Sequence, residues 1–542
     1  MTIPGLARGT LDAISQQERK HLKTLGLLQR AVMGTEIVNI GNGRLKRRYK
    51  VSFHHSTLPL AAFTPDIGPV DVWARQYLVL ENGQVYVEWK AAWLPSSEVA
   101  KELHVGVGDK EMDWADVIHE VLPSLYAVGP QDGDVSMIDL PNCIHIAGTK
   151  GKGSTCAYIE CMLRHHGRRT GYPKKTGLYT SPHLNNVQER IRINFDPLSE
   201  EKFAKYVSDV YTRLEVPKLG SDGPKYLQLL FLVSVHAFFQ EGVDVAIYET
   251  HHGGEFDATN ILAKPLVTAI TPIGRDHINE LGPTLQHVAW HKSGIFKPGV
   301  PAFSASQQPA LACVLKERAE EKGVLLQFVD PGVGFPLDVP LPESPVQLEN
   351  FALARAVSNE FLRQKGWKSL TALDERQAIS TFSWPGRFQR LTAGSITWFL
   401  DCAHNELSLQ VCAEWFARQS ADLDPDGSVH RAIVFSHFSN HRDHAALLKS
   451  LAHSLSRDRV IVHDAIFVPG PNAPSEFKDE QENVLELYAS HWSRIHPGSH
   501  VSKVSRPGQA LDLAASVRKD KIHVLVTGSI HLIGRAIQIL GA

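Results

Sequence analysis

The pattern of apolar and polar positions changes near residue 142, where short apolar runs begin to alternate with segments that have helical spacing. Apolar runs at 143–147, 243–248 and 266–270 are expected to be strands, and segments 154–166 and 226–240 are expected to be helices. The second and third runs lack polar alternation, which is typical of strands covered on both faces. This order predicts βαβ units around a mainly parallel sheet.

The C-terminal part of the chain predicts a second α/β domain. Four further strands are expected at 396–401, 431–436, 459–463 and 522–526, with helices between them. A stretch rich in proline and glycine at 330–345 is expected to be a loop, because these residues interrupt helices and strands.

The first 110 residues follow a different pattern and predict a small α+β unit. Helical spacing is found at 11–34, and a strand is expected at 49–55. Two β-rich runs, 72–80 and 84–94, flank Glu81-Asn82-Gly83, and Asn-Gly between such runs is a strong hairpin signal. This unit contains no catalytic constellation, so the sequence leaves its role open.

The composition excludes several classes of protein. Of 542 residues, 43% are hydrophobic and 21% are charged, which is typical of a folded globular protein and argues against disorder. The 56 basic and 58 acidic residues give a formal net charge of −2, so we expect local anion sites but no nucleic-acid partner. The longest apolar stretch, 227–239, is interrupted by polar residues and is too short to span a bilayer, so no membrane association is expected.

Cysteine usage and the N-terminus predict a cytoplasmic location. Six cysteines in so long a chain do not make a disulfide framework, and no Cys-x-x-Cys pair indicates zinc. Free thiols in a reducing compartment are the better interpretation. Residues 1–10 lack the apolar core of a signal peptide. Asp12 and Glu18 argue only weakly against a mitochondrial presequence, so a mitochondrial pool stays open.

The sharpest motif is segment 145–155, His-Ile-Ala-Gly-Thr-Lys-Gly-Lys-Gly-Ser-Thr, in which a strand leads into a glycine-rich loop and then a helix. Glycines let the backbone wrap a phosphate, the helix N-terminus adds partial positive charge, and Lys152 would reach the terminal phosphates. The loop is shorter than the common P-loop, and Gly153 separates Lys152 from Ser154. A glycine turn with a solvated lysine is the alternative, but the agreement of strand, loop, lysine and helix favours nucleotide binding.

Further motifs carry candidate metal ligands. Ser181 precedes a proline, and a hydroxyl beside a phosphate site would bind Mg²⁺, although a Ser-Pro turn is more often structural. Glu249 ends an expected strand, where α/β folds bind ligands, and is the best acidic candidate. The neighbouring His251 and His252 suggest zinc, but no third and fourth ligands stand at zinc-like spacing. His277 follows another strand and would bind a metal or orient a phosphate.

Four residues further along the chain complete the candidate set. Lys292 is of interest only if the rest of the site is in place, because a lysine in apolar surroundings usually extends its amine to solvent. Arg387, in Trp-Pro-Gly-Arg, would clamp a phosphate. Asp401 and His404 follow an expected strand, at the edge where ligands bind. Taken alone, each of these residues is more often structural.

In this order, the motifs closely resemble those of the folylpolyglutamate synthase family, part of the Mur-ligase superfamily. The resemblance covers the chain from about residue 112 to its end. The segments that carry it are 148–154, 178–184, 189–194, 253–260, 276–282, 292–297, 384–387, 401–404 and 524–534. So many motifs in one order make the resemblance specific at the level of the family.

The resemblance implies an α/β fold. It consists of a Mur-ligase-like P-loop ATPase domain with a mainly parallel sheet, a smaller Rossmann-like C-terminal domain, and here an N-terminal α+β extension. The implied boundaries are 1–110, 111–383 and 384–542. They place the 330–345 loop inside the ATPase domain.

The resemblance further implies an ATP-dependent amide ligase that adds L-glutamate to the γ-carboxylate of (tetrahydro)folate polyglutamates. ATP would phosphorylate a folate carboxylate, and the amine of glutamate would attack the acyl phosphate, so that ADP and phosphate are released. The implied cofactors are ATP and Mg²⁺, with K⁺ as a further candidate. The implied partners are folate, L-glutamate and ATP, and a monomer is expected. Such chemistry requires cations that neutralise charge on the transferring phosphoryl group.

The resemblance also assigns roles to individual residues. Lys152, His277 and Lys292 are the implied catalytic residues, and Lys292 matches a lysine that is carbamylated in many relatives. The implied Mg²⁺ ligands are Ser181, Glu249 and His277. The implied ATP-binding residues are Thr149, Lys150, Gly151, Lys152, Gly153, Ser154, Arg387, Asp401 and His404.

Departures from the family pattern bear on the carboxylate substrate rather than on ATP. Thr250-His251-His252 replaces the usual Val-Gly-Ile/Leu after the metal-binding glutamate, and Cys402 replaces a glycine. The family's N-terminal helix is hard to find, with 114–125 as the candidate. Two alternatives therefore stay open, a related amide ligase for a non-folate carboxylic acid and a non-catalytic nucleotide-binding protein.

Overall fold

The computed structural model describes most of the chain beyond residue 141 and six strands before it. The described ranges are 30–39, 45–53, 56–59, 74–79, 84–89, 92–95, 142–214, 226–275, 278–336, 339–342, 344–424, 426–437, 444–469, 478–517 and 520–541. The chain divides into two compact units. Unit 1 comprises Met1–Lys152, Ala204–Val333 and Ala352–Ser369, and unit 2 comprises Gly153–Phe203, Gly334–Phe351 and Leu370–Ala542. Segments far apart in the sequence therefore build each unit.

The central part of the chain contains an eight-stranded sheet with the order β10-β9-β8-β11-β7-β12-β13-β14. Its strands are β7 (Cys143–Ala147), β8 (Thr176–Tyr179), β9 (Ile191–Ile193), β10 (Asp196–Pro197), β11 (Val245–Glu249), β12 (Val267–Ile270), β13 (Ala302–Ala305) and β14 (Leu326–Val329). The five strands from β11 to β14 are parallel to their neighbours, whereas the β8–β9 and β9–β10 pairs are antiparallel. The prediction of a mainly parallel sheet is confirmed.

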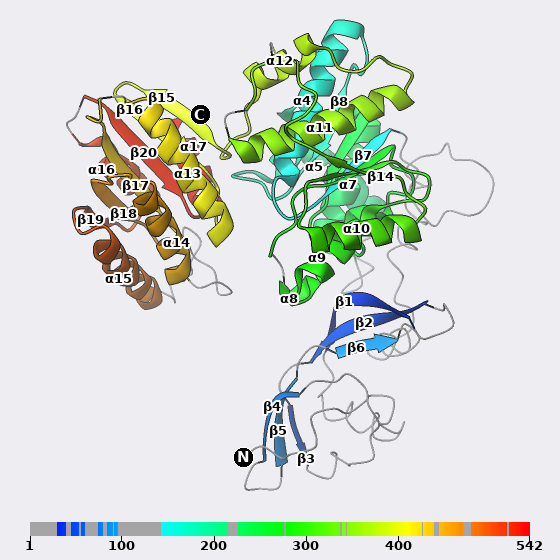
Figure 1. Ribbon diagram of the computed structural model, residues 1–542, viewed down its shortest axis with the longest axis horizontal. Coiled ribbons are helices and arrows are strands. Elements are labelled where there is room, and N and C mark those ends of the chain that lie inside the picture. Colours follow the sequence, from blue (N-terminus) through cyan, green and yellow to red (C-terminus); the bar gives the residue numbers. More distant parts are fainter. Residues whose placement is uncertain are drawn as a thin grey trace. The chain divides into compact units, whose positions relative to one another are not determined.

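In unit 1, helices cover the parallel strands and form an apolar core with them (Figure 1). The helices of this unit are α7 (Tyr226–Glu241), α8 (Ile278–Leu281), α9 (Leu285–Lys292) and α10 (Pro309–Glu321). Val288 of α9 and Leu315 of α10 pack in one cluster with Ala147 of β7 and Ile270 of β12. Strands β7, β11 and β12 are buried throughout, which explains their continuous apolar sequence. Helix α7 matches the expected helix at 226–240.

Unit 2 contains helices that precede and follow the central segments of the chain. These are α4 (Lys152–Thr170), which begins with the last residue of unit 1, and α12 (Ala372–Thr381). Helices α5 (Glu200–Arg213) and α11 (Pro345–Gln364) each have residues in both units. Glu160 of α4 accepts hydrogen bonds from Arg164 and from the Thr176 hydroxyl, at 2.9 and 2.7 Å, so this buried carboxylate is paired.

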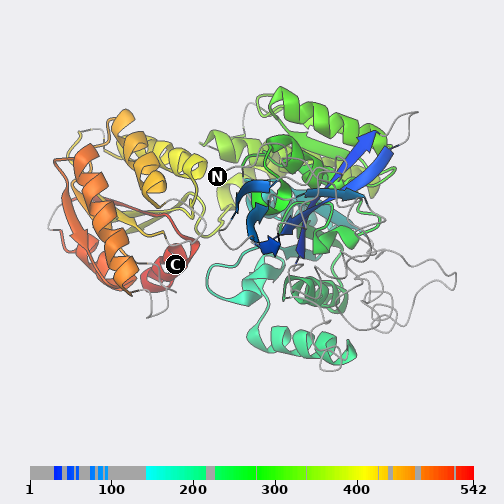
Figure 2. The ribbon, with the colours of Figure 1, turned by 90° about the horizontal axis from the view of Figure 1, so that it is seen from below.

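The C-terminal part of unit 2 is a six-stranded sheet with the order β15-β16-β20-β17-β18-β19. Its strands are β15 (Gln389–Ala393), β16 (Ile396–Leu400), β17 (His430–Phe435), β18 (Asp464–Phe467), β19 (His500–Lys503) and β20 (Ile522–Thr527). Only the β15–β16 pair is antiparallel. Figure 2 shows this segment in yellow to red, with its helices packed around its own strands.

Both faces of this sheet are buried against helices. The helices are α13 (Glu406–Asp422), α14 (His444–Arg457), α15 (Lys478–Ile495), α16 (Pro507–Ala515) and α17 (Ile530–Leu540). Along β17, Ile433 and Phe435 join a core with α13, α14 and α15, while Ala432 and Val434 join a second core with α16 and α17. This alternation follows from the two-residue period of a strand. The expected second α/β sheet is confirmed, with helices on both of its faces.

The N-terminal strands form two small antiparallel sheets. One has the order β1-β2-β6, from β1 (Arg30–Asn39), β2 (Leu45–Phe53) and β6 (Ala92–Pro95). The other has the order β3-β5-β4, from β3 (Ser56–Pro59), β4 (Ala74–Val79) and β5 (Gln84–Trp89). Strands β4 and β5 pair as antiparallel neighbours, which confirms the predicted hairpin, although its Asn-Gly turn lies outside the described residues.

Two predictions about local structure are wrong. The helix expected at 11–34 is a strand over 30–34, because these residues pair with β2; the earlier part lies outside the described residues. The strand expected at 459–463 begins only at Asp464, where pairing with Ala432 starts. The preceding residues lead out of α14 through Arg459, whose φ is +56°, and Ile461 is 68% exposed. Apolarity alone therefore predicted this strand at the wrong position.

Other expectations fall partly on residues that the structure describes. The described residues of the 330–345 loop contain no helix or strand before α11 begins at Pro345. The candidate N-terminal helix at 114–125 lies outside the described residues. All six cysteines are described and are free thiols. Among the helices that the structure describes, none combines the length and the apolarity that a membrane span requires.

Candidate active site

The glycine-rich loop leaves β7 and ends at the start of α4, as the sequence predicted. The backbone N–H groups of Thr149 and Lys150 donate to the Pro272 carbonyl, at 3.0 and 3.2 Å. The Thr149 hydroxyl donates to the Gly274 carbonyl at 3.2 Å. The segment after β12 therefore holds the first half of the loop, and two N–H groups that were expected to face phosphate are used within the protein.

Gly148 allows this close approach. Its φ is +147°, and a Cβ atom built there would lie 1.8 Å from the Thr271 hydroxyl oxygen. No side chain fits in that space, and the backbone conformation itself favours glycine. The glycine at the start of the loop is thus required by packing against the neighbouring strand end.

Lys152 and Glu249 meet beside this loop. The Lys152 Nζ lies 3.9 Å from the Glu249 Oε1, and the two side chains are 15% and 5% exposed. Strand β11 pairs in parallel with β7, with Glu249 opposite Ile146, so the carboxylate and the loop lie at the same edge of the sheet. The sequence prediction that Glu249 stands at the carboxyl end of a strand is confirmed.

Lys292 reaches the same loop from the end of α9. Its Nζ donates to the Gly148 carbonyl at 2.5 Å, and the residue is only 3% exposed. The amine is therefore not extended to solvent, which excludes the usual interpretation of a lysine in apolar surroundings. Lys152, Glu249 and Lys292, which the sequence placed on three separate segments, all lie at the glycine loop.

The histidines that replace the usual family residues have structural partners. The His251 Nδ1 lies 3.3 Å from the Asp257 Oδ1, and the backbone N–H of His252 donates to the Asp257 Oδ2 at 2.7 Å. Asp257 also accepts from the Thr259 hydroxyl at 2.7 Å, and the oxygen of that hydroxyl lies 2.7 Å from the His145 Nε2. Although burial opposes it, the hydrogen bonds from His251 and Thr259 hold the pKa of Asp257 well below its usual range. Burial lowers the pKa of His145 to about 3.

Of the other two expected metal ligands, the structure describes one. His277 lies outside the described residues. Ser181 belongs to unit 2 and precedes Pro182 in a cis peptide bond. In the described part of the chain, no group of three or more His, Cys, Asp or Glu side chains is arranged to hold a metal ion. The arrangement contains one candidate metal carboxylate, that of Glu249.

Near Ser181, one carboxylate organises the chain. Glu189 accepts the backbone N–H groups of Leu184, Asn185 and Asn186, at 2.8, 3.0 and 2.8 Å. A carboxylate with three N–H donors holds a loop in one conformation. Glu189 lies in the motif 189–194, but the sequence pattern predicted no role for it.

In unit 2, Asp401 is fully enclosed at the end of β16. Its two carboxylate oxygens accept the backbone N–H groups of Phe388 and Ala403, each at 2.9 Å. Burial raises the pKa of this carboxyl, and the Arg387 charge opposes the rise. The His404 Nδ1 donates to the Cys402 carbonyl at 2.8 Å. Arg387, Asp401 and His404 are thus neighbours, as the motif order suggested.

The remaining residues of the expected ATP set begin α4. Gly153 is half-buried and Ser154 is buried, both in the first turn of the helix. Lys150 and Gly151 lie in the loop before it, and the φ of Gly151 is +81°. The strand–loop–helix geometry of the motif is confirmed, while its contacts with a nucleotide stay a prediction.

Sequence reasoning missed a residue that supports the loop. The Gln307 side chain accepts from the Ile273 N–H and donates to the Thr271 carbonyl, both at 3.1 Å. It therefore holds the segment on which Thr149 and Lys150 rest. Gln307 follows β13 and carries no motif, so nothing in the sequence pointed to it.

Curated relatives of this chain share one name. The chain is 35% identical over 436 residues to the folylpolyglutamate synthase of Neurospora crassa, which covers 74% of this chain and 82% of that protein. It is 38% identical over 427 residues to the mitochondrial folylpolyglutamate synthase of Bos taurus, covering 71% and 70%. It is 34% identical over 446 residues to the probable folylpolyglutamate synthase of Schizosaccharomyces pombe, covering 77% and 86%. No protein-family model matches the chain.

Solved structures with the same fold also come from this family. E. coli FolC in complex with DHPP and ADP is 25% identical, with a TM-score of 0.61, over 82% of this chain and 96% of that chain. Mycobacterium tuberculosis folylpolyglutamate synthase complexed with ADP and AMPPCP is 21% identical, with a TM-score of 0.62, over 82% and 99%, which shows the fold alone. The Mur-ligase-like fold is therefore established. With relatives at 34–38% identity over most of their length, this chain belongs to the folylpolyglutamate synthase family.

Proposed function

We propose that this chain is an ATP-dependent ligase that adds L-glutamate to the γ-carboxylate of (tetrahydro)folate polyglutamates. The proposal rests on membership of the family, whose curated relatives are named folylpolyglutamate synthases. The structural observation that carries it is the meeting of Lys152, Glu249 and Lys292 at one glycine loop. That arrangement supplies a cation, a carboxylate and a fixed loop where a nucleotide's phosphates would bind.

The reaction has two steps. A substrate carboxylate oxygen attacks the γ-phosphorus of ATP, so that an O–P bond forms, the bond to the β-phosphate breaks, and ADP leaves. The amine of L-glutamate then attacks the acyl carbon, a C–N bond replaces the C–O bond, and phosphate and the amine's proton are released. Lys152 stabilises the negative charge on the transferring phosphoryl group. Lys292 holds the Gly148 carbonyl, and thereby the loop, in position.

We propose Mg²⁺ as a cofactor, supported by the oxygen-donor chemistry of Glu249. Glu249 is a buried carboxylate at the edge of the sheet, and carboxylate oxygen is a donor that this hard cation prefers. Glu249, with Ser181 and His277, would hold the ion, which when bound neutralises charge on the phosphates of ATP. K⁺ is a further candidate cofactor.

Unit 2 is proposed to contribute Arg387, Asp401 and His404 to ATP binding. The Asp401 carboxylate fixes the backbone at Phe388 and Ala403, and the neighbouring Arg387 guanidinium donates to the Gly386 carbonyl at 3.2 Å. We propose the boundaries 1–110, 111–383 and 384–542 for extension, ATPase domain and C-terminal domain. The protein is proposed to be a cytoplasmic monomer.

Mass spectrometry of the products tests the proposal. The purified protein is incubated with tetrahydrofolate, L-glutamate and MgATP, and the expected product is heavier by one glutamyl residue, with one ADP formed per amide bond. Omission of glutamate should stop ADP formation. A protein that binds ATP but forms no product with any folate would contradict the proposal.

The same assay separates the alternatives. If a panel of other carboxylic acids supports glutamate-dependent ADP release while folates do not, the chain is a related amide ligase with a different acceptor. If no acceptor supports turnover, the chain is a non-catalytic nucleotide-binding protein. The intact Lys152, Glu249 and Lys292 favour the catalytic interpretation.

A further inference from the structure

Two segments from different parts of the chain lie beside the glycine loop. One carries Glu249, and the other carries Lys292. The first segment begins at Glu249, the last residue of β11. The second segment, formed by α9 and η6 (Ser293–Ile295), begins at Leu285 and contains Lys292. Lys292 donates to the Gly148 carbonyl, and Glu249 lies beside Lys152. The distance between the Lys292 and Glu249 side chains therefore depends on the contacts that join the two segments.

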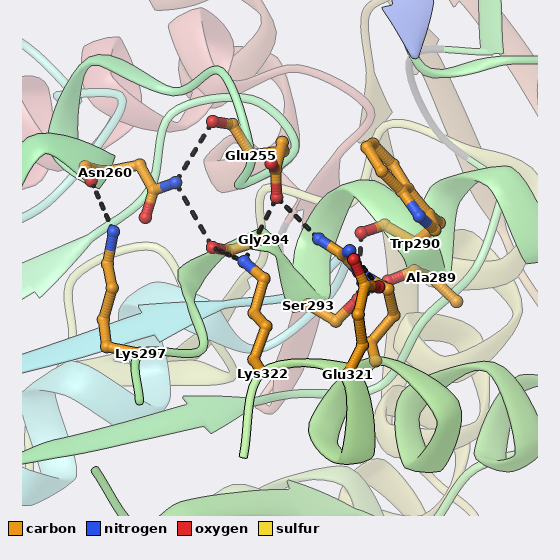
Figure 3. Close-up of polar contacts among 10 residues, drawn as sticks. Glu255, Asn260, Ala289, Trp290, Ser293, Gly294, Lys297, Glu321 and Lys322 are labelled. Atoms are coloured by element: carbon orange, nitrogen blue, oxygen red, sulfur yellow. Dashed lines mark hydrogen bonds and ion pairs between the residues drawn. The ribbon is translucent and has the colours of Figure 1, made fainter. Parts of the chain in front are cut away.

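Backbone contacts join the segments closely. The Glu255 N–H donates to the His291 carbonyl at 2.7 Å. A Cβ atom at Gly294 would lie 2.2 Å from the Glu255 Cα, so the two backbones touch where Gly294 stands. The Asn260 side-chain amide donates to the Glu255 and Gly294 carbonyls, at 3.1 and 3.3 Å, and so bridges both segments (Figure 3).

The Glu255 carboxylate ties both segments to α10. Its Oε2 accepts from the Arg318 Nη2 at 2.7 Å. The same oxygen lies 3.3 Å from the Lys322 Nζ (Figure 3). Lys322 in turn donates to the Gly294 carbonyl at 2.8 Å. The Arg318 guanidinium lies over the Trp290 ring, 4.5 Å from its centroid. One Glu255 carboxylate oxygen thus contacts both Arg318 and Lys322, and each of these cations also contacts the Lys292 segment.

The charges around Glu255 make it hard to replace. Arg318 is 3% exposed, and Lys297 is 7% exposed. The Lys297 Nζ donates to the Asn260 carbonyl at 2.8 Å. Burial and the nearby Lys322 charge lower the pKa of Lys297 to about 8, while Glu255 acts to raise it. Without the Glu255 charge, Arg318 and Lys322 would depend on the Glu321 carboxylate, which contacts Arg318 and is 34% exposed. Buried cations without partners are costly, so the segments would rearrange.

We propose that Glu255 is a positioning residue for the ligase reaction, which holds the Lys292 and Glu249 segments together at the glycine loop. It acts through the backbone of His291 and Gly294. This inference rests on the proposed function. The sequence motif Gly-Gly-Glu-Phe-Asp-Ala-Thr-Asn contains this glutamate, but its partner Arg318 lies 63 residues further on, so only the structure connects them.

The test compares Glu255→Gln with Glu321→Gln. Both variants remove one carboxylate from Arg318, but only Glu255 contacts the Lys292 segment. For Glu255→Gln we expect kcat to fall by about tenfold or more, because small displacements of a catalytic constellation have effects of this size. The KM for ATP should change less than about threefold, because the glycine loop itself is intact. Glu321→Gln should keep kcat within about twofold of wild type.

Two further measurements keep the result interpretable. The stoichiometry of nucleotide binding and the midpoint of thermal unfolding show whether the variant is folded and competent, so that a fall in kcat is not a loss of active protein. Mass spectrometry of acetylated protein reports the reactivity of Lys292 without any turnover. We expect faster acetylation of Lys292 in Glu255→Gln and an unchanged rate in Glu321→Gln.

The outcomes distinguish this inference from the proposed function. If wild type makes no glutamylated product but Lys292 becomes more reactive in Glu255→Gln, the proposed function fails and the positioning role stands. If wild type is an active ligase and Glu255→Gln retains kcat and Lys292 reactivity, the positioning role is overturned. Equal losses in both variants would likewise overturn it, since they would reflect the loss of any charge beside Arg318.

Discussion

At the scale of single residues, a partly exposed ammonium group faces a buried carboxylate beside the glycine loop. Lys152 is 15% exposed and Glu249 is 5% exposed, at a distance of 3.9 Å. The Nζ–Oε1 distance is longer than in a charge-assisted hydrogen bond, so the two groups are neighbours that do not form a tight ion pair. We propose that Lys152 takes part in binding phosphate and Glu249 in binding a cation.

We predict that Lys152→Ala abolishes ligation while the fold survives. The lysine supplies charge to the transferring phosphoryl group, and its removal should lower kcat/KM by about a hundredfold or more. Because its side chain stands at the loop rather than in the core, the midpoint of thermal unfolding should stay close to wild type. Steady-state assays and thermal unfolding on the same preparation check both statements. Near-normal turnover would refute the assignment of the loop to nucleotide binding.

Glu249→Gln should weaken the Mg²⁺ dependence of the reaction. The substitution keeps the shape of the side chain but replaces an anionic oxygen ligand with a neutral one. We expect the Mg²⁺ concentration that gives half-maximal rate to rise about tenfold or more. The matched control is His252→Ala, whose side chain is 44% exposed and which should leave bound metal unchanged. Stoichiometric zinc that is lost on changing His251 or His252 would contradict this assignment.

At the scale of elements, the ends of helices and strands place the candidate residues. Helix α13 follows Asp401 and His404 directly, and Asn405 caps it. The Asn405 side chain accepts from the Ser408 N–H at 3.0 Å, and the Ser408 hydroxyl lies 3.2 Å from the Asn405 N–H, which forms a capping box. The cap therefore determines where the Asp401–His404 segment ends and the helix begins.

Asn405→Ala should lower the stability of the C-terminal part of the protein. Loss of a helix cap costs about 1 kcal/mol, and Asn405→Ser should retain most of it because serine is an equally good cap. Urea denaturation followed by circular dichroism measures the difference between the two variants. Equal stability of Asn405→Ala and wild type would show that the cap is dispensable.

At the scale of the whole molecule, several buried histidines are held neutral in the folded state. Burial lowers the pKa of His145 to about 3 and the pKa values of His291 and His523 to about 4. An unfolded chain protonates these groups near pH 6.5, so between pH 6.5 and 4 the unfolded state binds more protons. Stability is therefore expected to fall on acidification through this window, by up to about 1.4 kcal/mol per pH unit for each histidine.

A histidine variant tests this pH dependence. In His523→Leu one of the three groups is removed, and the Ser420 hydroxyl that faces it keeps its contact with Arg431 at 2.7 Å. We expect a shallower fall of the unfolding midpoint between pH 6.5 and 4. His453→Leu, at an exposed position of α14, should leave the slope as in wild type. Parallel curves for all three proteins would contradict the assignment.

The N-terminal extension is expected to be accessory to the ATP site. Every phosphate and metal candidate lies beyond residue 142, and the described strands before it form their own small sheets. A protein that starts near Lys110 should bind ATP with unchanged affinity. If it also ligates glutamate, the extension is accessory; if ligation is lost while ATP binding persists, the extension shapes the acceptor site. Loss of ATP binding by a folded truncated protein would refute the prediction.

Sequence by itself determined the fold class, the glycine loop and most candidate residues, because these depend on local signals. A buried parallel strand has a continuous apolar sequence. The polar residue that ends or follows it stands at the carboxyl end of the strand, where α/β folds bind ligands. Glu249 was found in this way and Lys152 from the glycine loop, and the structure places them 3.9 Å apart. The resemblance added roles for Lys292 and Arg387, and the chemistry, which spacing alone left open.

Tertiary structure decided what depends on contacts between distant segments. Local spacing could not show that Lys292 turns inward to Gly148, that Gln307 supports the loop, or that Arg318 pairs with Glu255. The strand at Asp464 was misplaced for the same reason, since pairing with a neighbouring strand, rather than apolarity, determines where a strand begins. Charged side chains acquire partners only when the chain folds, so their roles are set by the assembled structure rather than by the sequence pattern.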